Sequence, residues 1–238
     1  GAVDAGRDYI VDAQGLVRLA TFIDATQQAG RNVAISSATD GIRVAIGRLT
    51  LIANSDGTAA NNTESLSLTA AGDITLGNSA LIGGTVAGRE SDISVVSSGG
   101  AVTLGKLDGA SIVIRGAGDV IVGEALTAGN AARGADPVGG FSTVDIVSSA
   151  GAIRLLNATA TGAGHDITLS AFGDVTGLAG PSTGTTDTAF ARVPLTAADD
   201  VTITAGGLVQ LSTASAGGNL AITTGDAMRD GAIDVISA

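Results

Sequence analysis

Apolar residues at alternate positions recur in short stretches along the chain, and these stretches fall into two sets. Such a period of two is typical of a β-strand with one buried face. The first set has apolar residues at Val33/Ile35, Leu66/Leu68, Ile93/Val95, Ile112/Ile114, Val144/Ile146, Ile167/Leu169, Val201/Ile203 and Leu220/Ile222. The second set follows at a step of 8 or 9, with Ile42/Val44, Ile74/Leu76, Val102/Leu104, Val120/Val122, Ile153/Leu155, Val175 and Val209/Leu211. The constant step predicts two strands in every repeat, and a first pair of strands between Tyr9 and Leu19.

The shortest full repeat is the step from Ile93 to Ile112 (112 − 93 = 19), and the step from Val201 to Leu220 is equal to it (220 − 201 = 19). This length holds two strands, three corners and a shorter third segment. Hairpins also fit so short a spacing, but the fixed order of the two sets argues against them. A unit of this size cannot bury its own apolar face, whereas stacked copies form continuous interior ladders and pair every backbone group. We therefore predict an all-β fold, a right-handed parallel β-helix of about 19 or more residues per coil, with residues 1–238 as one segment of a longer repeat shaft.

Short links rich in Gly and Asp join the two strands of a repeat. They read AAGD before Ile74, GAGD before Val120 and AFGD before Val175. Gly adopts a positive φ at no steric cost, and Asp bonds the backbone N–H groups that follow it, so each link is expected to be a tight corner. The residues between the inward pairs should face solvent. Those expected on the second face include Arg43, Thr75, Thr103, Ile121, Arg154, Thr176 and Gln210.

The interval from a second strand to the next first strand varies widely. The shortest runs from Val102 to Ile112 (112 − 102 = 10), and the longest runs from Val175 to Val201 (201 − 175 = 26). Because insertions in a solenoid map to loops on one side, we expect the insertions at one edge of the coil. They are segments 54–64, 128–141 and 181–195, bounded by Asn54 and Glu64, Ala128 and Phe141, and Pro181 and Leu195. One interpretation is that loops vary where packing permits. The other is that these loops bind a partner, such as a host or bacterial surface glycan or protein.

Composition narrows the possible functions. The chain has 36 Gly, no Cys, 2% aromatic residues and a net charge of −11, with no cluster of Lys or Arg. Nucleic-acid binding is excluded because it requires a basic surface. Gly, Ser, Thr or Asp interrupts every apolar stretch, so no transmembrane segment is expected. The first ten residues, GAVDAGRDYI, contain neither Met nor a signal peptide, and we expect a processed or excised piece of a longer protein.

A β-helical enzyme or binding protein for polysaccharides, similar to pectate lyases, is the alternative function. Such a site needs converging carboxylates, a basic group and aromatic platforms for sugar rings. Asp73, Asp119, Asp166 and Asp174 instead stand at corners, where turn formation explains them. The single His165 is also expected at a corner, without a catalytic partner. We therefore expect no enzyme activity and no cofactor.

Calcium is the metal that the acidic residues could attract. The pair Asp199-Asp200 and the spacing of Asp226, Asp230 and Asp234 offer carboxylates. The calcium-binding nonapeptide GGxGxDxUx does not occur, however. We therefore expect no specific metal site.

The repeat resembles that of filamentous-haemagglutinin-like exoproteins of Gram-negative bacteria. The resemblance covers nearly the whole chain and lies in DITLG (73–77), AVTLG (101–105), GDVIVG (118–123), GHDITLS (164–170) and GGNLAITTGD (217–226). It implies a secreted or cell-surface protein, exported by an outer-membrane transporter partner (two-partner secretion). It also implies virulence-related roles in adhesion, aggregation or contact-dependent growth inhibition. The Asn-Pro-Asn signature of that family's secretion domain is absent, so the resemblance is to the repeat shaft. No Arg-Gly-Asp is present, and residues 133–136 read Arg-Gly-Ala-Asp.

Overall fold

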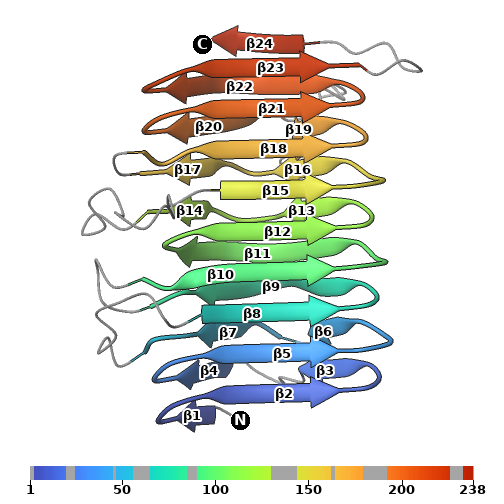
Figure 1. Ribbon diagram of the computed structural model, residues 1–238, viewed down its shortest axis with the longest axis vertical. Helices are drawn as coiled ribbons and strands as arrows, with labels where there is room; N and C mark the ends of the chain where they lie inside the picture. The colour runs from blue at the N-terminus through green and yellow to red at the C-terminus, as the bar shows by residue number, and fades with distance from the viewer. Residues whose placement is uncertain are drawn as a thin grey trace.

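A computed structural model describes residues 3–19, 25–44, 47–55, 65–84, 90–129, 144–161, 164–178, 192–225 and 233–237 of the chain. These residues form 24 strands and no helix. The strands wind into a right-handed parallel β-helix, with the two termini at opposite ends of the stack (Figure 1). No helix that could cross a membrane was found among these residues. The predicted fold class is confirmed.

Three faces enclose the core, and face 1 is a single parallel sheet of nine strands. It is the sheet nearest the viewer in Figure 1. Every adjacent pair in face 1 is in register without a bulge. Its strands are β2 (Tyr9–Ala13), β5 (Val33–Ser37), β8 (Ser65–Ala70), β10 (Asp92–Ser97), β12 (Ile112–Gly116), β15 (Val144–Ser148), β18 (Ile167–Ala171), β21 (Val201–Ala205) and β23 (Leu220–Thr224).

Faces 2 and 3 together form a second sheet, because three long strands bend from one face into the other. These strands are β9 (Ile74–Ile82), β11 (Val102–Gly109) and β22 (Val209–Ala216). Face 2 also contains β3 (Val17–Leu19), β6 (Ile42–Val44), β13 (Val120–Val122), β16 (Ile153–Leu155), β19 (Val175–Gly177) and β24 (Ile233–Ser237). Face 3 also contains β1 (Val3–Ala5), β4 (Ala25–Ala29), β7 (Leu49–Ile52), β14 (Leu126–Ala128), β17 (Ala158–Ala160) and β20 (Val193–Ala197).

The two predicted sets of strands correspond to faces 1 and 2. Ile93 pairs in register with Ile112, and Val201 with Leu220, as the shortest repeat in the sequence requires. The predicted apolar pairs of face 1 are at most 1% exposed from Val33/Ile35 to Val201/Ile203, so they form the predicted interior ladder. Leu220 is 39% exposed because β23 is the end strand of its sheet and pairs with β21 alone.

Two buried rows of small residues mark the corners of the coil. Ala128, Ala160 and Ala197 stack in register at the end of face 3. Buried serines stand at the end of face 1 in alternate coils, between coils that have Ala or Gly at that position. Their hydroxyls each donate a 2.8 Å hydrogen bond to a glycine carbonyl in the coil below, from Ser37, Ser97 and Ser148. The buried serine hydroxyls at this corner thus satisfy glycine carbonyl groups of the neighbouring coil.

The three insertions do not all follow the same face. The first two separate a face 3 strand from a face 1 strand, β7 from β8 and β14 from β15. The third separates β19 of face 2 from β20 of face 3. The expectation of one common edge therefore holds for the first two insertions and is wrong for the third. The interval counted from the sequence spans two corners, because face 3 lies inside it.

Candidate functional site

A polar groove lies at the corner between faces 2 and 3, where one coil has a minimal corner. In β11 this corner is Gly105 alone, placed between Leu104 of face 2 and Lys106 of face 3. A Cβ on Gly105 would lie 2.2 Å from the backbone oxygen of Ser79 in the coil below. Only glycine fits so close an approach.

An ion pair spans this bare corner. Arg48, just before β7, donates a hydrogen bond of 3.2 Å to the Glu124 carboxylate, which lies between β13 and β14. The two residues are 76 positions apart in sequence. Their coils are separated by the coils of β9 and β11, so both side chains extend along the rod axis to meet. The pair is half exposed, and an ion pair of this kind contributes at most about 1 kcal/mol to stability.

The groove has a volume of about 360 Å³ and is lined by Gly47, Arg48, Asn78 and Glu124. Its side chains offer guanidinium donors, an amide that both donates and accepts, and carboxylate acceptors. Such a set binds hydroxyl groups and other neutral polar groups through paired donors and acceptors. The volume is at the lower end of the range for small-molecule sites, which is about 300–1,000 Å³.

A second polar cluster stands at the corner that precedes face 1. Carboxylate oxygens of Asp166, Asp199 and Asp200 lie within 4.8 Å of one another. Asp166 accepts a hydrogen bond of 2.9 Å from the backbone N–H of Asp200. Asp200 in turn accepts hydrogen bonds from Asn219, 2.6 Å from its backbone N and 3.1 Å from its amide. These hydrogen bonds join three successive coils, so Asp166 and Asp200 have a structural role in holding the coils together.

The same kind of ladder begins the rod. Asn32 donates a 2.8 Å hydrogen bond from its side-chain amide to Asp8 in the coil below. This hydrogen bond, which favours the carboxylate, lowers the pKa of Asp8 from its ordinary value. Asn32 also accepts a 2.9 Å hydrogen bond from the backbone N–H of Ser65 in the coil above. At this corner, as at Asp200, a side-chain oxygen accepts a hydrogen bond from a backbone N–H of the next coil.

His165 stands beside the acidic cluster, at the corner before β18 as expected. Its side chain is 2% exposed, and its backbone carbonyl accepts a 3.1 Å hydrogen bond from the N–H of Asp199. Of the other residues considered for calcium, Asp226 and Asp230 lie outside the described residues, and the side chain of Asp234 is not described.

Three of the six residues that bound the predicted partner-binding loops are described, and all three are buried. Asn54 follows β7, is 1% exposed and has a φ of 48°. Ala128 ends β14 and Leu195 lies within β20, and both are fully buried. These three belong to the wall of the rod. Glu64, Phe141 and Pro181 lie outside the described residues.

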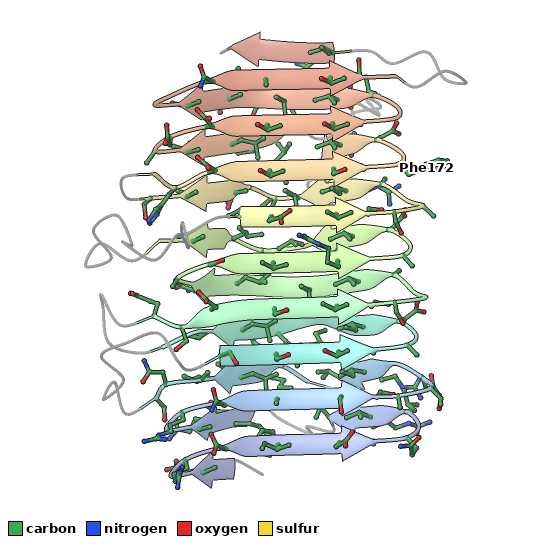
Figure 2. The ribbon with its side chains drawn as sticks, viewed as in Figure 1. Phe172 is labelled. Carbon is green, nitrogen blue, oxygen red and sulfur yellow. The ribbon has the colours of Figure 1, made fainter. Side chains whose placement is uncertain are left out.

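One prediction for an individual side chain is wrong. Thr176 is predicted to face solvent on face 2 but is only 4% exposed. Asp145 and Arg154 belong to separate pairs, Asp145 with Arg115 and Arg154 with Asp119. An exposed aromatic ring is present at one corner: Phe172 is 46% exposed and points away from the coil after β18 (Figure 2).

The groove itself is not predicted by the sequence. Its residues come from separate coils, and the first insertion, segment 54–64, lies between Arg48 and Asn78 in the sequence. The short link Gly105 is the one local signal. Comparisons of the chain with protein-family models, with curated proteins and with solved structures found no match.

Proposed function

We propose that this chain is a rod segment of a secreted bacterial surface protein and that it acts as a structural or adhesive shaft, not as an enzyme. The observation that supports this most is the unbroken register of face 1 through all nine of its strands. Nine coils at about 4.8 Å each give a rod about 40 Å long. Solenoids of this kind are extended surfaces and spacers, since each coil contacts only its neighbours.

The chemistry of the corners supports the same proposal. Aspartates that could serve an acid–base mechanism are used to hold one coil on the next, as Asp73, Asp119 and Asp174 show. The resemblance to filamentous-haemagglutinin-like exoproteins supports the proposed cell-surface location and the proposed export through an outer-membrane transporter.

The experiment is an assay of the purified chain on acidic and neutral polysaccharides. A shaft leaves the polysaccharides intact, so we expect neither unsaturated nor reducing ends to be released. If either product is released, and if this release is lost in the Glu124→Gln variant, the enzyme alternative would replace the proposed shaft function.

Binding of a neutral glycan is the second candidate, and the groove favours it. Arg48, Asn78 and Glu124 together provide donors and acceptors for sugar hydroxyls. A glycan screen tests this candidate, with Arg48→Gln and Glu124→Gln as site variants and Arg154→Gln as the control on face 2. Binding that both site variants reduce and the control retains would support the adhesive form of the shaft. Absence of binding would indicate that the shaft has a structural role and not an adhesive one.

A further inference from the structure

Face 1 presents mostly small side chains on its outer surface, and its strands stay nearly parallel from β2 to β23 (Figure 1). Each of its nine strands has two central outward positions, and successive residues at these positions stack in register. Only Asp12, Arg115 and Asp145 are charged among them. The other positions are Ser, Thr, Val and Ala, with Ile10 at the N-terminal end.

The two central charges neutralise each other and lie along the face. The Arg115 guanidinium donates to the Asp145 carboxylate and also to two backbone carbonyls, 3.0 Å from Asp145 O and 3.2 Å from Ile114 O. Both side chains are about two-thirds buried already, which reduces the cost of removing them from water. Val96 and Val147 flank Arg115 in register, and Val113 pairs with Asp145. An apolar patch with an internally paired charge therefore occupies the middle of face 1.

We propose that face 1 is the contact surface between two copies of this chain, packed sheet against sheet. Nine strands about 4.8 Å apart and five residues about 3.3 Å each give an area of roughly 650 Å² per copy. The total of roughly 1,300 Å² lies within the range of stable protein interfaces, about 1,200–2,000 Å². A two-fold axis makes the same patch serve both copies. This contact is independent of the proposed shaft function and would add a lateral pairing of rods to it.

The charge distribution makes the centre of face 1 the surface on which a second copy is repelled least. The chain has a net charge of −11, so two copies repel each other over most of their surface. At the centre of face 1 the paired Arg115 and Asp145 leave no net charge. A sheet face of mostly short side chains can pack against another such face, and the second copy provides one with the same spacing between strands.

Sedimentation velocity of the full chain over a range of concentrations tests the proposal. We expect the mass of a dimer in the micromolar range. The double variant Ser94→Glu/Thr168→Glu places charges on face 1 and should remain a monomer at the same concentrations. Thr75→Glu/Thr103→Glu, on face 2, changes the net charge equally and should still dimerise. A monomer at every concentration, or equal dissociation of both variants, would overturn the proposal.

Cross-linking gives an independent measurement, because the chain has no cysteine. Val113 lies in β12, the fifth of the nine strands and hence close to a two-fold axis at the middle of the face. Val113→Cys should form a covalent dimer under mild oxidation, whereas Thr103→Cys on face 2 should not. Circular dichroism confirms that each variant retains its β-structure. Cross-linking of both variants alike, or of neither, would contradict the assigned surface.

Discussion

The Asp119 carboxylate accepts a hydrogen bond of 2.8 Å from the backbone N–H of Ala152, which lies one coil further along the rod. The same bond joins Asp73 to Ala101 and Asp174 to Leu208, each at 2.8 Å. At these corners a side chain takes the place of the backbone carbonyl in the bonding between coils. The aspartates are therefore part of the vertical connection of the rod.

Replacing Asp119 by Ala should lower the free energy of unfolding by about 1–2 kcal/mol, because the N–H of Ala152 loses its acceptor. Asp119→Asn keeps an acceptor oxygen and should cost less. Asp108→Ala is the matched control, since it removes only an exposed ion pair with Lys106 and should cost about 1 kcal/mol or less. Urea unfolding followed by circular dichroism measures all three. Equal losses for Asp119→Ala and Asp108→Ala would contradict the role of the corner.

The inward and outward phase of face 1 predicts opposite outcomes for two neighbouring residues. Ile167 is fully buried, and Thr168 faces outward in register with Asp145. Ile167→Asp should cost about 3–5 kcal/mol because it buries an unpaired charge, or should abolish folding. Thr168→Asp should change stability by only about 1 kcal/mol or less. Thermal unfolding distinguishes them, and similar midpoints for the two variants would refute the assignment.

Gly105 should be far less tolerant of substitution than Gly123. A Cβ at Gly105 would meet the Ser79 carbonyl oxygen at 2.2 Å, whereas at Gly123 the nearest atom, Leu104 O, is 3.5 Å away. We expect Gly105→Ala to cost roughly 2 kcal/mol or more, since backbone must move, and Gly123→Ala to be near neutral. Chemical denaturation of both variants gives the comparison. Equal stability of the Gly105→Ala and Gly123→Ala proteins would contradict the close approach of the two coils at Gly105.

Removal of a whole coil should be tolerated, because the strands of each coil pair only with those of its neighbours. Deletion of residues 201–219 brings Leu220 directly after Asp200, where Val201 stood, so β23 can stack on β18. We expect a folded rod shorter by about 4.8 Å, with an unchanged circular dichroism spectrum per residue. Deletion of 201–220 removes one residue more and inverts the faces of the following strand. This second deletion should lower the melting temperature, and equal stability of the two would argue against the register.

The ionisation of Tyr9 should make the N-terminal coil sensitive to high pH. Burial raises the pKa of Tyr9 above its ordinary value of 10.0, so the folded state holds the phenolic proton more tightly than the unfolded state. The stability associated with this shift is fully present below pH 10.0 and is lost as pH rises through the raised pKa. Tyr9 is the one tyrosine, and there is no tryptophan, so the ultraviolet absorbance of tyrosinate measures it alone. Titration of the folded chain at an unshifted pKa would contradict this, and Tyr9→Phe should remove the alkaline loss.

The sequence is sufficient to predict faces 1 and 2, because their inward positions hold Val, Ile and Leu at strict alternation. Face 3 is harder to recognise in the sequence. Its inward positions include the small residues Ala128, Ala160 and Ala197, whose apolar signal is weak, and the insertions interrupt its spacing. The sequence pattern therefore places the third insertion at the wrong corner. The repeat length gives the strand residues that stack in register, such as Ile93 and Ile112, but not the side-chain partners at the corners.

The corner aspartates are likewise predicted only in part from the sequence. Their position is predicted from the sequence, but their expected partners are the N–H groups of their own turn. In the structure Asp119 bonds an N–H that is 33 residues away, in the next coil. The Arg48–Glu124 pair cannot be predicted for the same reason, since it requires the register of four successive coils.

The coils differ widely in the length of chain they use but not in height. One coil runs from Ile93 to Ile112 (112 − 93 = 19), and another runs from Ile167 to Val201 (201 − 167 = 34). Each adds the same spacing of about 4.8 Å along the axis. The reach of such a protein thus increases in fixed increments set by the number of turns of chain. Residues gained or lost at a corner change the local girth, so decoration can evolve without altering how far the rod extends.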